Sequence, residues 1–196
     1  MKNHILFVCF LVSSIFGFSQ EASLPEVLTA DSSWTKEVIK FPLGFAPDID
    51  FEGYEDIRFS KGWRKQDQED FWTYAFTWKV NLTKELTIAS LEQSFQLYYD
   101  GIMKAVNKDK DFTVPESTIL FIKDESAKAP TYIGKLNVYD SFASKKMMKL
   151  NVHLEYRLCP TTQELIPLFR ISPQPFDHAI WKELHNVTLV DNACDH

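Results

Sequence analysis

The chain has 196 residues, of which 27 are acidic and 21 are basic, and its formal net charge is −6. Aromatic residues are abundant, with 16 Phe, 7 Tyr and 5 Trp, whereas Gly is scarce at 6. This composition excludes a disordered or low-complexity chain, and the acidic balance argues against nucleic acid as a partner. The length suits one domain with a substantial core.

Residues 1–19 predict a cleavable signal peptide. Lys2 precedes an apolar run from Ile5 to Phe18, and Ser19 supplies a small residue where signal peptidase cuts. The run is shorter than the roughly 20 residues that a membrane helix needs, and an uncleaved anchor is the alternative. Cleavage removes Lys2 and moves the net charge from −6 to −7. We expect a secreted or periplasmic protein without stable membrane insertion.

Residues 20–33 are polar, contain Pro25 and predict a flexible lead-in. The globular domain is therefore expected over residues 34–196. Apolar residues that alternate with polar ones are typical of strands whose two faces differ. They predict the first three strands over residues 37–43, 57–61 and 71–81, with Pro42 placing the first of them near a sheet edge.

The third predicted strand carries a row of large side chains on one face. The row consists of Trp72, Tyr74, Phe76, Trp78 and Val80. Aromatic side chains fill the large volume between a sheet and a helix, so we interpret the row as core. A stacking platform for a sugar or an apolar ligand is the alternative.

The apolar period then changes to three or four residues, which predicts one long helix over residues 87–107. Ser90 with Gln93 has the spacing of a capping box, and an earlier start at Thr87 or Thr83 is the alternative. Gly101 weakens the middle of a helix by about 1 kcal/mol relative to Ala, so we expect a packing reason for it.

The second half of the chain again predicts strands, at residues 118–123, 131–140 and 146–159, followed by a hairpin. The hairpin turns at Pro160–Gln163 and should oppose Leu158 to Leu165, Tyr156 to Pro167, Leu154 to Phe169 and Val152 to Ile171. A short helix is expected at 176–186 and a tail strand at 187–190. The whole pattern predicts an α+β domain with a mainly antiparallel sheet of six or seven strands, packed by one long helix and carrying a short C-terminal helix.

Two cysteines, Cys159 and Cys194, remain after cleavage of the leader. An oxidising compartment would let them pair and close a loop of 36 residues, which the chain-entropy model values at about 3–4 kcal/mol. Free thiols are the alternative. A structural zinc site is disfavoured because two thiols supply only half of one.

The acidic segment with Asp48, Asp50 and Glu52 resembles the opening of a calcium loop. The twelfth position of such a loop should be Glu, but here it is Phe59. We therefore interpret the segment as a solvated turn and expect no metal, with a looser calcium site as the alternative.

Three polar residues of the strand at 146–159, His153, Glu155 and Arg157, share one face and are the weak candidates for catalysis. A histidine beside a carboxylate can move protons at neutral pH, but no nucleophile accompanies the pair at a recognisable spacing. His178 and His185 lie seven residues apart, which is too far for the usual zinc pair on a helix. A solvated face explains both groups.

No cofactor or nucleotide motif is present, so no cofactor is expected. Trp34, Tyr54 and Trp63, in or near loops, are the ligand-contact candidates. The leading hypothesis is a secreted or periplasmic non-enzymatic domain that binds a ligand or a protein partner. The alternatives are an extracytoplasmic hydrolase with a His/carboxylate site and a structural, envelope-associated protein. A cavity between helix and sheet that is lined by Trp and Tyr would favour a small ligand.

Overall fold

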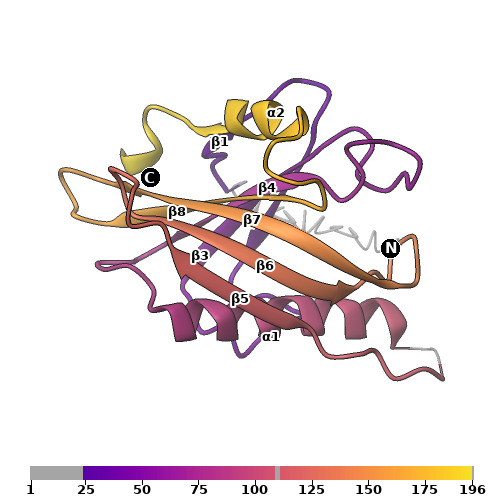
Figure 1. Ribbon diagram of the computed structural model, residues 1–196. Coiled ribbons are helices and arrows are strands. Elements are labelled where there is room, and N and C mark those ends of the chain that lie inside the picture. The colour runs from indigo at the N-terminus through magenta and orange to yellow at the C-terminus, as the bar shows by residue number, and fades with distance from the viewer. Residues whose placement is uncertain (1–23, 109–110, 196) are drawn as a thin grey trace, which may run out of the picture.

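The computed structural model describes residues 24–108 and 111–195, and the predicted signal peptide lies outside them. Seven strands form one antiparallel sheet, and the long helix α1 lies across one of its faces (Figure 1). The elements are β1 (Leu28–Thr29), β2 (Thr35–Lys40), β3 (Gly53–Phe59), β4 (Tyr74–Val80), α1 (Ile88–Asn107), β5 (Thr118–Lys123), β6 (Thr131–Tyr139), β7 (Met147–Leu158), β8 (Leu165–Ser172), α2 (Ile180–Asn186), β9 (Thr188–Leu189) and a short 3-10 helix (Ala193–Asp195). The α+β prediction is confirmed.

The strand order of the sheet is β2-β3-β4-β8-β7-β6-β5. β2, β3 and β4 follow one another as a meander, and α1 then carries the chain to the far edge, where β5 begins. β5 to β8 return strand by strand until β8 pairs with β4. The last long strand therefore joins the two halves of the sheet.

The face of the sheet under α1 holds the main core. Phe76 stacks on Phe169 of β8 with ring centroids 4.6 Å apart, and Trp78 packs edge-on against the same ring at 5.0 Å. Phe95 of α1 lies 5.1 Å from Phe169 and closes this cluster from the helix side. The prediction that Tyr74, Phe76, Trp78 and Val80 are core residues is confirmed, since all four are buried.

Trp72 is the exception in the predicted row, because the strand begins only at Tyr74. Trp72 has a positive φ of 53° and ends the connection between β3 and β4. Its indole is nevertheless buried, with 2% of the residue exposed. The side chain contributes to the core from a loop and not from a strand.

The hairpin of β7 and β8 has the predicted register. Leu158 opposes Leu165, Tyr156 opposes Pro167, Leu154 opposes Phe169 and Val152 opposes Ile171. Matched parity is the condition for a stable register. The apolar side chains of these pairs are buried, except for Leu158 beside the turn, which is exposed. β2 lies at a sheet edge, as Pro42 indicated.

The opposite face of the sheet is covered by α2 and by the two-stranded β1–β9 ribbon, which Figure 1 shows above the sheet. Trp181 and Leu184 of α2 pack with Leu168 of β8 and Leu28 of β1. Arg170 anchors the end of α2, because its guanidinium donates to the carbonyl oxygens of Leu184 and Val187.

The segment that the sequence predicts to be a flexible lead-in is held in place from Leu24 onward. Val27 and Leu28 are buried, and both of their backbone N–H groups donate to Asp56 Oδ2, at 2.7 and 2.9 Å. Arg58 donates to the Leu28 carbonyl at 2.7 Å. The carboxylate that binds this backbone comes from β3, which is distant in the sequence.

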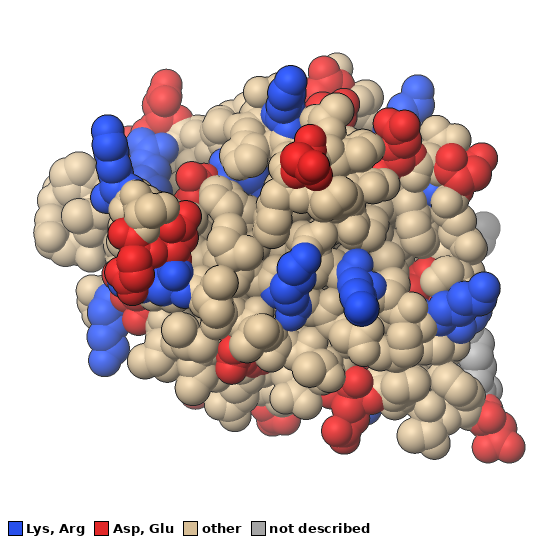
Figure 2. Space-filling model, viewed as in Figure 1, with Lys and Arg blue, Asp and Glu red and all other residues tan. Residues whose placement is uncertain are grey.

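Cys159 and Cys194 form a disulfide. It ties the end of β7 to the C-terminal 3-10 helix, which supports the predicted pairing. Within residues 24–108 and 111–195, no helix has the length and apolarity needed to cross a bilayer. On the face in Figure 2, basic and acidic side chains are interspersed and no large area carries one sign of charge.

The cap of α1 is Thr87, one of the two alternative starts, and not Ser90, because Thr87 Oγ1 accepts a hydrogen bond from the Ser90 N–H at 3.1 Å. Gly101 has the packing reason that we expected. A Cβ built at this position would lie 2.1 Å from the carbonyl oxygen of Phe45. The backbone of the segment after β2 therefore approaches α1 too closely for any side chain.

We expect Gly101→Ala to lower the free energy of unfolding by about 1–3 kcal/mol, because the methyl group must displace the backbone at Phe45. Urea denaturation measures the change. Gly44→Ala is the matched control, since a Cβ there meets no atom within 4 Å. Equal stabilities of the two variants would contradict the close approach.

Candidate functional site

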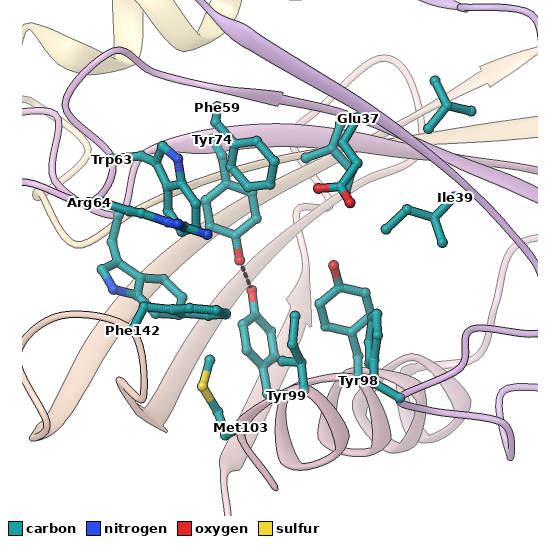
Figure 3. Close-up of a pocket in the computed structure, with 15 residues that line it drawn as sticks. Glu37, Ile39, Phe59, Trp63, Arg64, Tyr74, Tyr98, Tyr99, Met103 and Phe142 are labelled. Carbon is teal, nitrogen blue, oxygen red and sulfur yellow. Dashed lines mark hydrogen bonds between the residues drawn. The ribbon is translucent and has the colours of Figure 1, made fainter. Parts of the chain in front are cut away.

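A cavity of about 480 Å³ lies between the edge of the sheet at β2–β4 and the C-terminal half of α1. Its volume falls within the roughly 300–1,000 Å³ of small-molecule sites. Figure 3 shows aromatic side chains on most sides of it. The lining consists of Glu37, Val38, Ile39, Phe45, Ile57, Phe59, Trp63, Arg64, Trp72, Tyr74, Tyr98, Tyr99, Ile102, Met103 and Phe142.

One wall of the cavity comes from the β3–β4 connection, whose backbone is closely tied. Gly62 N–H donates to Asp70 Oδ2 at 2.7 Å, and Trp72 N–H donates to the Trp63 carbonyl at 2.9 Å. These bonds fix the turn that presents Trp63, whose ring stacks on Phe59 with centroids 4.5 Å apart. The Trp63 side chain is thus held both by its loop backbone and by the ring of Phe59.

A second loop, between β6 and β7, brings Phe142 to the same wall. Asp140 Oδ1 accepts the N–H groups of Phe142 and Ala143 at 2.8 and 3.1 Å, and Ser144 N–H donates to Oδ2. Burial raises the pKa of Asp140, but the hydrogen bonds from these backbone N–H groups together lower it by more. The pKa of Asp140 therefore lies below its usual value. The ionised carboxylate thereby organises the loop.

The floor of the cavity contains three buried tyrosines. The hydroxyls of Tyr74 and Tyr99 hydrogen-bond to each other (Figure 3), and Tyr98 donates its hydroxyl proton to Glu55 Oε1 at 3.0 Å. Burial raises the pKa values of all three phenols, so they remain protonated at neutral pH. They form a neutral, hydrogen-bonding base beneath an apolar space.

Glu55 lies directly behind this floor and is fully buried. Burial raises its pKa to about 8, although the hydrogen bond from Tyr98 lowers it and the charge of Glu37 raises it further. Its Oε2 atom has no hydrogen-bond partner among the described residues. At neutral pH, this carboxyl is therefore largely protonated.

Two charged side chains reach the cavity, Glu37 from β2 and Arg64 from the β3–β4 connection. The Arg64 guanidinium carbon lies 4.6 Å from the centre of the Trp63 ring and 5.6 Å from that of Phe142. Within residues 24–108 and 111–195, neither charge has an ion-pair partner within 4.0 Å. Figure 3 places them on different sides of the cavity.

Of the three aromatic residues predicted to contact a ligand, only Trp63 lines this cavity. Trp34 packs against the cluster around α2, on the other face of the sheet. Tyr54 is buried beside Cys159 and Ile166, also on that face. The structure therefore does not bring the three together.

The catalytic candidates His153, Glu155 and Arg157 lie on the face opposite the cavity. Glu155 pairs with Arg170, and Arg157 donates to the Val190 and Asp191 carbonyls. Burial raises the pKa of Glu155, but the Arg170 guanidinium lowers it more, so this carboxylate is ionised. Two of the three side chains thus hold the C-terminal segment to the sheet.

The structure brings His153 next to His185 of α2, with ring centroids 5.3 Å apart. The contact between a strand and a distant helix has no characteristic sequence spacing, and His178, which is closer in sequence, is not the partner of His185. His178 Nδ1 accepts the Ile180 N–H near the start of α2. Burial lowers the pKa of His153, which favours the neutral imidazole.

The acidic segment with Asp48, Asp50 and Glu52 is exposed and follows β2. Among the residues that the structure describes, no group of three or more His, Cys, Asp or Glu side chains has a metal-binding arrangement. The candidates therefore remain separate acidic side chains of a surface loop.

Sequence reasoning missed Arg64, Phe142 and Glu37 as cavity residues. Arg64 and Phe142 lie in connections without periodicity, and Glu37 occupies an edge strand where a charge is ordinary. The neighbouring Trp63 was the one usable signal, because an aromatic residue in a polar loop is uncommon.

Comparisons of the chain with protein-family models, curated proteins and solved structures found no match.

Proposed function

We propose that this protein is an extracytoplasmic, non-enzymatic domain that binds a small amphipathic ligand in the cavity between α1 and the sheet. The observation that carries the proposal is a cavity of about 480 Å³ that is lined mainly by aromatic and aliphatic side chains and by only a few polar groups. Small-molecule sites combine an apolar lining with a small number of placed polar groups. This site has both.

The extracytoplasmic part of the proposal is supported by two features. The leader has the pattern of an export signal, and the Cys159–Cys194 disulfide is compatible with an oxidising compartment. The hydrolase alternative gains no support from the geometry. Glu155 and Arg157 are engaged in structural contacts, and His153 faces α2 on the side of the sheet away from the cavity.

We expect a fluorescent amphipathic probe, anilinonaphthalenesulfonate, to bind the native protein and to bind Ile102→Trp at least about ten-fold more weakly. Ile102 lines the cavity, so an indole at this position fills space that the probe needs. Fluorescence titration measures the affinity, and displacement of the probe by a panel of fatty acids, sterols and aromatic acids then screens ligands.

Val106→Trp is the matched control, because Val106 lies one helical turn further along α1 and does not line the cavity. This variant should bind the probe as the native protein does. Thermal denaturation checks that both variants are folded. Equal binding to the two variants, or no binding by the native protein, would overturn the proposal.

A further inference from the structure

The polar groups of the cavity are divided by hydrogen-bonding character. On one side, the planar guanidinium of Arg64 lies between the rings of Trp63 and Phe142 (Figure 3). Aromatic faces hold a guanidinium by cation–π attraction and leave its N–H edge free to bind a carboxylate. No hydrogen-bond acceptor or ion-pair partner for it is found in residues 24–108 and 111–195, so its donors are unused there.

The pair formed by Tyr74 and Tyr99 adds one more donor. A bond between two hydroxyls uses one of their two protons, and the structure shows no acceptor for the second among the residues it describes. Arg64 and this hydroxyl pair therefore both offer hydrogen to a ligand.

The other side of the cavity offers acceptors. Glu37 turns its carboxylate toward the cavity from β2, as Figure 3 shows. Tyr98 donates its hydroxyl hydrogen to Glu55 Oε1, so its hydroxyl oxygen is left to accept a hydrogen bond from a group in the cavity. Glu55 thus acts as a positioning residue for Tyr98.

The two charges differ in sign and are not paired with each other, although they share one cavity. Both side chains are exposed, and a ligand with a single charge can form a charge-assisted hydrogen bond with only one of them. A ligand with both charges satisfies both side chains. The apolar lining between them suits a hydrocarbon or aromatic body.

We infer that the ligand is an apolar zwitterion, whose carboxylate is bound by Arg64 and whose amine is bound by Glu37 and the Tyr98 hydroxyl. This inference rests on the proposed function and adds the chemical class of the ligand. The apolar body lies between the two charged groups, against Ile57 and the aromatic side chains of the cavity.

Three matched compounds test the inference by isothermal titration calorimetry at neutral pH. They are para-(aminomethyl)benzoate, para-toluate without the amine, and para-methylbenzylamine without the carboxylate. The zwitterion is also tested as the homologue with one more methylene and as the biphenyl analogue, so that charge separation is varied. At least one zwitterion should bind about ten-fold or more tightly than either single-charge compound.

Two variants assign the contacts. Arg64→Gln should remove the advantage of the zwitterion over the amine, and Glu37→Gln should remove its advantage over the carboxylate. The matched controls Lys65→Gln and Glu52→Gln change exposed neighbouring charges that do not line the cavity, and should leave all affinities unchanged.

If no zwitterion binds more tightly than the better single-charge compound, the inference is wrong. Preference for para-toluate would make the site an anion receptor, and preference for the amine would make it a cation receptor, both against the inference. In each of these cases, the native protein would still bind anilinonaphthalenesulfonate, and Ile102→Trp would still bind it more weakly. Failure of the proposed function is distinguished by the absence of that probe binding.

Discussion

Glu55→Gln is expected to gain stability over the native protein as pH rises from about 5 to about 8. The carboxyl of Glu55 is fully buried, and its pKa is raised from 4.5 to about 8, first by desolvation. An amide at this position keeps an acceptor for the Tyr98 hydroxyl and carries no charge at any pH. Only the native protein should show the resulting pH dependence.

The sign follows from proton binding. Between the unfolded pKa of 4.5 and the folded pKa of about 8, the folded state holds a proton that the unfolded state has lost. The stabilising contribution is complete below 4.5 and is lost as pH rises through the folded pKa. Over the middle of this window, the native protein should lose about 1.4 kcal/mol per pH unit relative to Glu55→Gln.

Urea denaturation of both proteins at several pH values between 5 and 9 measures the difference in unfolding free energy. These pH values cover most of the window between the two pKa values of Glu55. Glu52→Gln, which changes an exposed carboxylate near the start of β3, is the control and should show no such trend. A difference between native protein and Glu55→Gln that stays constant with pH would show that the carboxyl is not protonated in the fold.

Arg58→Met should lower the free energy of unfolding by about 3–5 kcal/mol. Arg58 is 4% exposed, pairs with Asp56, and donates to the carbonyls of Ile57 and Leu28 at 2.8 and 2.7 Å. Methionine fills the volume but leaves the buried Asp56 without its cation. Burial already raises the pKa of Asp56 against the opposing effect of Arg58, so loss of the guanidinium should raise it further.

The loss should be concentrated in the first ordered segment. Hydrogen exchange at the amides of Val27 and Leu28, which donate to Asp56, should accelerate more than exchange in β7. The matched control is Lys36→Met, since the Lys36–Glu26 pair is exposed and is worth about 0–1 kcal/mol. An Arg58→Met protein as stable as Lys36→Met would contradict the anchoring role.

The elements that repeat a simple period were predictable from the sequence. The β7–β8 register followed from parity on both sides of a turn, and α1 followed from its apolar stripe. These features depend on neighbours within one hairpin or one helix. The predicted α+β architecture is confirmed for the same reason.

The cavity was not predictable, because its parts come from segments that are distant in the chain. Trp63, Phe142 and Glu37 meet only after the whole sheet has formed, and no local pattern records that meeting. Glu55 has the parity of the core face of β3, but an acidic residue reads as a solvent position. Glu55 is buried there because the hydroxyl of Tyr98, on α1, donates a hydrogen bond to its carboxyl group.

The strand order has a consequence for how this chain matures. β4 emerges early, yet its inner neighbour β8 lies near the C-terminus, so a partly synthesised chain presents a bare central edge. Such an edge is a template for pairing with other molecules. Truncation before Leu165 should therefore produce aggregation and not a smaller stable protein, and completion of the polypeptide is itself the step that commits it to the native state.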